Sequence, residues 1–394
     1  MKGQQVKMID LRTLEYIAEI PVGGVPRPIA VDADETLYLS SIILHFKLEG
    51  TMKRSHIGWA GFLLALCISP TLSAQTILGS YNVNPNTVTV AGVSSGGFMA
   101  VQLQVAYSRS IFGTAVFAGG TYFCAQDNLA LWGNACSSGN GVPVASLVSF
   151  TNSEANAGQI DPTSNIANKP IYMFSGVFDT VVQQPTMNDL HQYYQSFTNS
   201  SNINYNNFTG AQHAWISPDA VTACGVLASP FINNCGIDPE KTFLAMFYGS
   251  LNARRSGSLS GSFIKFNQNQ FCPNSNCSSI DMDSTAWAFV PQNCAQLQAC
   301  RLVIALHGCS ANQQFIGTAF VQGSGINEWA DTNNIIVLYP QTIASNVPAN
   351  AFGCWDWWGY TGPHYALKSG PQMVAIMAEV NRITGGKEQF LGHP

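Results

Sequence analysis

Continuous apolar runs recur along the chain from residue 75 onward, separated by polar and glycine-rich stretches. They occupy Thr87–Val90, Gly113–Gly120, Ile171–Gly176, Arg301–Leu306 and Ile335–Pro340. Strands that are apolar on both faces are typical of a mostly parallel sheet covered by helices on both sides. Helix-compatible segments at Met99–Tyr107 and Gln372–Arg382 supply such cover, whereas residues 196–210 and 251–300, rich in Asn, Ser and Gln, are expected to be surface loops. The pattern predicts one α/β domain over residues 75–394.

The first 51 residues follow a different pattern. Short runs at Ile9–Glu15, Ile20–Val31 and Leu37–Ser40 predict short strands with turns between them, similar to one blade of a β-propeller. A single blade can neither close a ring nor bury both of its faces. We therefore expect residues 1–51 to be an upstream extension without a function.

Residues 52–74 have the composition of a secretory signal peptide. A basic start, Met52–His56, precedes the apolar run Ile57–Ile68, and Thr71–Ala74 ends in small residues before Gln75. The apolar run is short for a membrane span, so no stable membrane insertion is expected after cleavage. Because a signal peptide belongs at an N-terminus, we expect Met52 to be the true start, or upstream sequence to have been joined to it.

Composition narrows the class of protein further. Only 10% of residues are charged, against about 25% in ordinary domains, and a polar but weakly charged surface suits a secreted, extracellular protein. The formal net charge of −5 provides no basic footprint for nucleic acid. No cysteines and histidines have zinc-site spacing, so neither a metal nor a cofactor is expected.

The chain has eleven cysteines, of which Cys67 lies in the predicted signal peptide. The remaining ten form an even set, which in a secreted chain indicates a disulfide-stabilised fold. Connectivity does not follow from sequence. The simplest scheme joins near neighbours: 124 with 136, 224 with 235, 272 with 277, 294 with 300, and 309 with 354.

A Gly-x-Ser-x-Gly pattern at Gly92–Gly96 lies between the strand Thr87–Val90 and the helix-compatible segment. Strand, sharp turn and helix are the context of a nucleophile elbow, which would expose the hydroxyl of Ser94 above the sheet. The five residues alone also fit a turn with no chemistry. A catalytic interpretation requires an acid and a base further along the chain.

Asp179 and His213 are the candidates for these roles. Asp179 follows the buried strand Ile171–Gly176, and His213 lies in a glycine-containing loop further on. The order Ser, Asp, His is that of α/β-hydrolases. His213 would accept the proton of Ser94, and Asp179 would orient the imidazole. The alternative candidates for the acid, Asp161, Asp189 and Asp238, do not directly follow a buried strand. The alternative base, His191, is predicted to lie on the surface of a helix.

An acyl-transfer site also needs two donors for an oxyanion. The backbone N–H of Ser95, the residue after the nucleophile, is one candidate. The other is the backbone N–H of Cys309, in the Leu306–Ser310 segment that follows the strand Arg301–Leu306. Hydrolases carry this His-Gly strand before the elbow, and this chain carries it after the base. Joining Ile383 to Tyr81–Pro85 would restore the usual order, so the sequence predicts a circularly permuted α/β-hydrolase.

Together, these segments resemble the secreted poly(3-hydroxybutyrate) depolymerases, in particular the circularly permuted single-domain type. The resemblance covers roughly residues 76–385 and rests on separated motifs in the expected order: Gly92–Met99, Phe174–Gly176 with Asp179, Gln212–Trp215, Leu306–Cys309 and Cys354–Tyr360. It implies hydrolysis of a polyester or oligoester substrate by Ser94, Asp179 and His213. Many members carry a separate polymer-adsorbing domain; here we expect adsorption to use the surface of the catalytic domain.

An aromatic loop follows at Cys354–Tyr360. Trp355, Trp357 and Trp358 are candidates for an apolar substrate groove, with Trp355 and Trp357 on one side if the loop is extended. The alternative is that some of them belong to the core. Two other functions stay open, namely a feruloyl or acetyl-xylan esterase and a non-catalytic binding protein of the same fold.

Overall fold

The structure is a computed structural model that describes residues 4–9, 16–22, 76–346 and 350–386. The chain divides into two compact units, residues 1–70 and 71–394. In the first unit, β1 (Gln4–Ile9) and β2 (Tyr16–Val22) form an antiparallel pair. The first strand thus ends at Ile9, where the sequence suggested that one begins. The strands expected near 29–31 and 37–40, and the predicted signal peptide at 52–74, lie outside the described residues and stay predictions.

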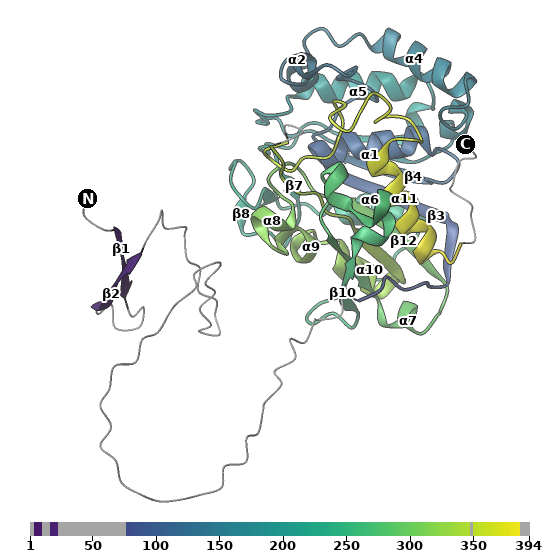
Figure 1. The fold of residues 1–394 in the computed structure, drawn as a ribbon. Coiled ribbons are helices and arrows are strands. Elements are labelled where there is room, and N and C mark those ends of the chain that lie inside the picture. Colours follow the sequence, from purple (N-terminus) through teal and green to yellow (C-terminus); the bar gives the residue numbers. More distant parts are fainter. Residues whose placement is uncertain (1–3, 10–15, 23–75, 347–349, 387–394) are drawn as a thin grey trace, which may run out of the picture. The chain divides into compact units, whose positions relative to one another are not determined.

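An eight-stranded sheet forms the centre of the second unit (Figure 1). Six neighbouring strands run parallel, and two antiparallel strands extend one edge. In spatial order the strands are β10 (Ser262–Asn267), β11 (Thr285–Val290), β13 (Ile335–Tyr339), β12 (Cys300–Leu306), β3 (Val83–Val93), β4 (Gly113–Phe117), β5 (Ile171–Phe174) and β6 (Ile203–Asn206). The mostly parallel sheet predicted from the continuous apolar runs is confirmed.

Two hydrophobic cores lie on opposite faces of this sheet, because successive side chains of a strand point to opposite sides. Val88 and Val90 of β3 belong to one core, and Ala91 and Val93 belong to the other. The first core is covered by α1 (Ser95–Ala106), α4 (Val144–Asn156), α5 (Gln184–Gln195) and α11 (Pro371–Ile383). The second is covered by α6 (Pro239–Tyr248), α9 (Ala319–Gly323) and α10 (Ile326–Asn333). Helices on both faces were expected from the sequence.

Smaller elements fill the connections. A three-stranded sheet has the order β7 (Trp215–Ile216), β9 (Ile232–Asn234), β8 (Thr222–Ala223). Short helices are α2 (Leu129–Trp132), α3 (Ala135–Ser138), α7 (Gln292–Ala295) and α8 (Gln313–Ile316). Turns of 3₁₀ helix lie at Thr163–Ile166, Ser200–Asn202, Gln268–Phe271, Pro273–Ser275 and Cys277–Ile280. In the part of the chain that the structure describes, no helix is both long and apolar enough to cross a membrane.

The loop prediction for residues 196–210 and 251–300 is wrong in part. Strand β6 lies in the first segment, and β10 and β11 lie in the second. These strands are short and are flanked by the Asn and Ser residues that made both segments look like loops. Their pairing depends on neighbours far away in sequence, such as β13 beside β11, which local composition cannot reveal.

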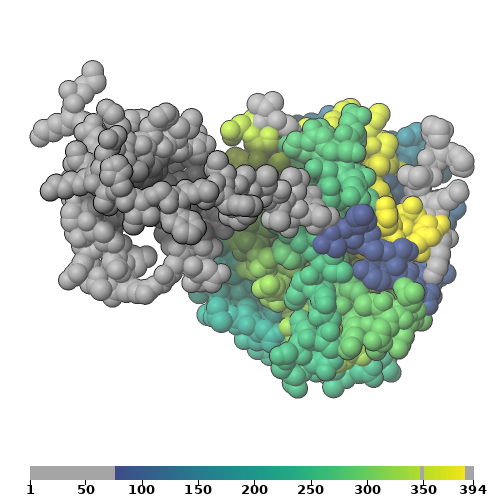
Figure 2. Space-filling view, turned by 60° about the horizontal axis from the view of Figure 1, so that its bottom comes forward, coloured from purple at the N-terminus to yellow at the C-terminus, as the bar shows by residue number. Residues whose placement is uncertain are grey.

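The first and last described segments of the second unit meet. The backbone N–H of Tyr81 donates a hydrogen bond to the carbonyl oxygen of Ile383, at 2.8 Å. Figure 2 shows the blue beginning of this unit beside the yellow segment at its end. Starting from β12 and passing through β13, α11, β3 and β5 gives the strand and helix sequence of an α/β-hydrolase. The circular permutation is therefore confirmed, with its joint where the sequence predicted it.

Five disulfides cross-link the unit, and each one matches the near-neighbour scheme. They join Cys124 to Cys136, Cys224 to Cys235, Cys272 to Cys277, Cys294 to Cys300, and Cys309 to Cys354.

Candidate active site

Ser94 lies between the end of β3 and the start of α1, with φ 57° and ψ −124°. A positive φ is strained for any residue with a Cβ, so the surrounding backbone must hold it in place. The Ser94 N–H donates to the Phe117 carbonyl at 2.9 Å. A Cβ at Gly92 would overlap the Gly96 carbonyl, and one at Gly96 would overlap the carbonyl of His307. The two glycines of the motif therefore permit the close packing that this turn requires.

Asp179 and His213 form a hydrogen-bonded pair, with Asp179 Oδ2 2.8 Å from His213 Nδ1. Both side chains are nearly buried, because the loop after β5 and the loop before β7 pack together. The other oxygen of Asp179, Oδ1, accepts the backbone N–H groups of Val181 at 2.8 Å and Val182 at 2.9 Å. One oxygen of the carboxylate thus anchors it to its own loop while the other oxygen orients the imidazole.

Two of the rival acids and the rival base have other structural partners. Asp161 pairs with Lys368 at 2.8 Å, and Asp238 caps α6 by accepting the Lys241 N–H at 2.9 Å. His191 lies on α5, where its ring packs against Tyr205. These contacts explain the three residues as parts of the scaffold.

The loop after β12 passes beside the nucleophile. A Cβ built at Gly308 would lie 3.1 Å from the Cβ of Ser94, so only glycine fits there without displacing a neighbour. The backbone N–H groups of Ser95 and Cys309 have no protein acceptor among the described residues. Both residues line the same cavity as Ser94. Two such donors beside a serine hydroxyl could bind a developing oxyanion.

His307 supports this loop from behind. It is fully buried, and burial lowers the pKa of its imidazole to about 4, so the ring is neutral at ordinary pH. The neutral ring donates from Nδ1 to the Gly308 carbonyl at 2.8 Å, while Nε2 accepts the Thr342 N–H at 3.3 Å. Because Gly308 and Cys309 share a peptide bond, holding the Gly308 carbonyl also fixes the direction of the Cys309 N–H.

A cavity of about 450 Å³ contains these groups. Ser94, Ser95, His213, Gly308 and Cys309 line it, whereas Asp179 lies behind His213. Most of the remaining wall is apolar and includes residues that the sequence did not single out: Phe98, Trp132, Val181, Val182, Leu227, Phe231 and Phe352. Trp132 belongs to the segment closed by the Cys124–Cys136 disulfide, and that short cysteine loop was the available signal.

The structure separates the three candidate tryptophans. Trp357 lines the cavity, stacked on Phe98 with 3.9 Å between ring centroids. Trp355 points away from the cavity: it is fully buried, and its indole N–H donates to the His307 carbonyl at 3.0 Å. Trp358 packs against Trp132 and Tyr360 outside the cavity lining. Trp355 and Trp357 were expected to share a side only if the loop were extended, and residues 356–361 form a tight turn instead.

Within the described ranges, no group of His, Cys, Asp and Glu side chains is arranged to hold a metal ion.

These features define the class of protein. A serine at a strand-to-helix elbow, a paired Asp and His, and free backbone donors on a mostly parallel sheet are the parts of an α/β-hydrolase.

Comparison with known proteins identifies the family. A poly(3-hydroxybutyrate) depolymerase of Delftia acidovorans is 42% identical over 332 residues, which cover 83% of this chain and 65% of that protein. This chain therefore spans just under two thirds of the Delftia protein. A polyhydroxybutyrate depolymerase of Talaromyces funiculosus is 40% identical over 328 residues, covering 79% of this chain and 94% of that one. The family model described as esterase PHB depolymerase matches residues 285–386. The chain belongs to the PHB depolymerase family.

Solved structures agree with this assignment. The crystal structure of PHB depolymerase from Penicillium funiculosum superposes with a TM-score of 0.73 at 39% identity, covering 79% of this chain and all of that one. A serine-to-alanine variant of a PHB depolymerase, complexed with an R3HB trimer, matches with the same TM-score at 38% identity and the same coverage.

Proposed function

We propose that this protein is a secreted serine esterase that hydrolyses poly(3-hydroxybutyrate) or its oligomers through an acyl-enzyme. The observation that carries the proposal is the apolar cavity in which Ser94, His213 and the free N–H groups of Ser95 and Cys309 meet. The family relatives named for the same polyester, and the relative complexed with an R3HB trimer, support the choice of substrate.

The proposed reaction uses these groups in the order of a serine hydrolase. Ser94 Oγ attacks the ester carbonyl carbon while its proton passes to His213 Nε2, and the carbonyl oxygen becomes an oxyanion held by the Ser95 and Cys309 N–H groups. The C–O bond to the leaving alcohol then breaks, and His213 returns the proton to that alcohol. A water molecule, deprotonated by His213, releases the acyl group as a carboxylic acid and frees Ser94. Asp179 keeps the imidazole oriented and stabilises its charged form.

The walls of the cavity suit a polyester with methyl branches. Val181, Leu227 and Phe352 line the cavity and remain 41%, 44% and 59% exposed. Apolar side chains that reach from the cavity to solvent offer an adsorption surface for a solid polymer. The indole ring of Trp357 adds to this apolar wall.

A polymer-clearing assay tests the function and separates it from the alternatives. Wild type and Ser146→Ala, a control on the exposed face of α4, should clear suspended polymer equally, and Ser94→Ala should not clear it. Equal clearing by Ser94→Ala would remove Ser94 from the mechanism. Failure of wild type to clear polymer, together with activity on feruloyl or acetyl-xylan esters, would favour a carbohydrate esterase. Binding to polymer without any ester hydrolysis would indicate a non-catalytic binding protein.

Secretion has its own test. The signal-like segment 52–74 predicts a mature N-terminus near Gln75, which mass spectrometry of protein from the culture medium would identify. A cell-bound product that retains residues 52–74 would contradict secretion.

A further inference from the structure

The side chain of Asp356 is the centre of the turn that follows the Cys309–Cys354 disulfide. Asp356 is 1% exposed. Its Oδ1 accepts the backbone N–H groups of Gly359 at 2.7 Å, Tyr360 at 3.1 Å and Trp358 at 3.3 Å. Its Oδ2 accepts the Thr361 N–H at 2.8 Å and the Thr361 hydroxyl at 2.6 Å. One buried carboxylate thus gathers four consecutive peptide N–H groups and one hydroxyl.

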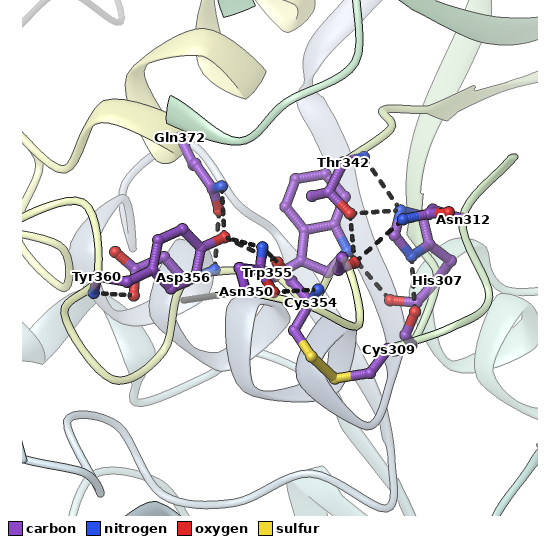
Figure 3. Close-up of a disulfide and its surroundings, with 12 residues drawn as sticks. His307, Cys309, Asn312, Thr342, Asn350, Cys354, Trp355, Asp356, Tyr360 and Gln372 are labelled. Carbon is purple, nitrogen blue, oxygen red and sulfur yellow. Dashed lines mark hydrogen bonds between the residues drawn. A yellow bond between two sulfur atoms is a disulfide. The ribbon is translucent and has the colours of Figure 1, made fainter. Parts of the chain in front are cut away.

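The main chain of Asp356 is itself fixed from two helices. Its N–H donates to Gln372 Oε1 of α11 at 2.8 Å, and its carbonyl accepts Gln102 Nε2 of α1 at 3.0 Å. Nε2 of the same Gln372 side chain donates to Tyr360 Oη at 2.8 Å. The Tyr360 hydroxyl in turn donates to the Cys354 carbonyl at 2.7 Å. Figure 3 shows this chain of contacts running from Gln372 through Tyr360 to the disulfide. The carboxylate of Asp356 is therefore an acceptor at a fixed point in the scaffold.

In the chain, Trp357 lies between Asp356 and residues 358–361, whose N–H groups bind the Asp356 carboxylate. Its ring stacks on Phe98 at 11° between the ring planes and lines the cavity that contains Ser94. Phe98 belongs to the first turn of α1, directly after the nucleophile. The indole of Trp357 also packs against the rings of Trp132 and Trp358. Trp358 belongs to the turn that Asp356 holds, through the hydrogen bond from the Trp358 N–H, so the position of the Trp357 ring depends in part on the backbone path of residues 358–361.

We propose that Asp356 is a positioning residue, whose carboxylate holds the turn of residues 356–361 so that Trp357 is presented to substrate in the cavity. The role of Trp357 in this proposal rests on the polyester esterase activity proposed above. Burial raises the pKa of the Asp356 carboxyl, and the donors of Thr361, Gly359 and Tyr360 oppose that rise. No lysine or arginine pairs with it among the described residues, so backbone dipoles are its main electrostatic support.

Asp356→Asn is the principal test, because it keeps the shape of the side chain and replaces one of its two acceptor oxygens by an NH₂ donor. If the amide oxygen replaces Oδ1, the amide NH₂ faces the Thr361 N–H, and two donors then oppose each other. The triad and the oxyanion donors are untouched. The measured quantity is the ratio of kcat/KM for a 3-hydroxybutyrate trimer to kcat/KM for 4-nitrophenyl acetate. We expect this ratio to fall by about tenfold, because one misplaced hydrogen bond costs about that factor. The loss should appear mainly in KM.

Two milder variants cover the case in which Asp356→Asn fails to fold. Thr361→Val removes only the hydroxyl donor and should lower the same ratio by a smaller factor, whereas Thr361→Ser retains the hydroxyl and should restore it. Asp283→Asn is the matched control, since Asp283 also holds a turn, through the Thr285 N–H at 2.9 Å, but does not line the cavity. A ratio that is unchanged in Asp356→Asn and Thr361→Val, or that falls equally in Asp283→Asn, would overturn the proposal.

A second readout does not need the substrate. Acrylamide should quench tryptophan fluorescence more strongly in Asp356→Asn than in wild type, and this increase should vanish when Trp357→Phe is added to both. Equal quenching in wild type and Asp356→Asn would contradict the positioning role. If wild type does not cleave the trimer at all, the proposed function fails, and the quenching experiment still decides whether Asp356 positions Trp357.

Discussion

Replacing Asp179 with Asn tests the acid–base half of the site most sharply. Asp179 Oδ1 accepts two backbone N–H groups, from Val181 and Val182, and Oδ2 faces His213 Nδ1 at 2.8 Å. In Asp179→Asn the amide oxygen must occupy the Oδ1 position, because an NH₂ group there would face two donors. The NH₂ group is then directed at His213 Nδ1. The imidazole must accept that hydrogen bond, so its proton moves to Nε2.

This tautomer cannot receive the proton of Ser94. The same substitution in a serine protease triad lowers kcat by about 10⁴-fold, which corresponds to roughly 5.4 kcal/mol of transition-state stabilisation at 1.36 kcal/mol per factor of ten. Because both anchoring hydrogen bonds of the loop survive, we expect the melting temperature of Asp179→Asn to stay within a few degrees of wild type.

Steady-state hydrolysis of a soluble 3-hydroxybutyrate oligomer provides the assay, with thermal melting as the check on folding. The control is Asp189→Asn, a partly buried carboxylate on α5 that does not contact His213. It should retain wild-type kcat. A folded Asp179→Asn variant with kcat within tenfold of wild type would refute the assignment of Asp179 as the residue that orients His213.

Three further predictions concern the scaffold. The double variant Cys309→Ser/Cys354→Ser should lower kcat by up to the ~10²–10³-fold that loss of one oxyanion donor costs, and unchanged turnover would contradict the coupling of this disulfide to the oxyanion loop. Gly96→Ala should lower stability by about 3 kcal/mol or more, because its Cβ would overlap the Leu306 and His307 carbonyls; Gly133→Ala, with open space around it, should melt like wild type. Burial raises the pKa of Glu379 well above its ordinary value, and neither carboxylate oxygen has a partner among the described residues. Because the folded-state pKa is the higher one, its contribution to stability is complete at low pH and is lost as pH rises through that value. Between acid and alkaline pH, Glu379→Gln should therefore lose less stability than wild type, as measured by thermal melting. An identical pH dependence of stability in the two proteins would exclude Glu379 as a source of this loss.

Much of the fold could be predicted from sequence, because the informative residues act locally. Runs that are apolar on both faces specify central parallel strands, and the order of the Ser94 and His307 motifs specified the permuted connection. The disulfide between Cys309 and Cys354 followed from pairing the other eight cysteines with near neighbours. The strands β10 and β11 were missed because their stability comes from β13, far away in sequence.

The aromatic loop shows where sequence reasoning about the site stops. Three tryptophans in four residues suggested a groove, but only tertiary contacts decide which of them faces it. Trp355 is drawn into the core by the His307 carbonyl, and Trp357 is turned toward Phe98 by the tight turn around Asp356. Nothing in the sequence shows that the carboxylate of Asp356 accepts hydrogen bonds from five donors in a buried place.

Identification of the acylated residue tests the central claim most directly. Wild type would be quenched in acid during turnover of a 3-hydroxybutyrate oligomer, digested, and mapped by mass spectrometry. We predict a 3-hydroxybutyryl ester on the peptide that contains Ser94, and none in the Ser94→Ala variant. An acyl group on another residue, or continued turnover by Ser94→Ala, would contradict the account.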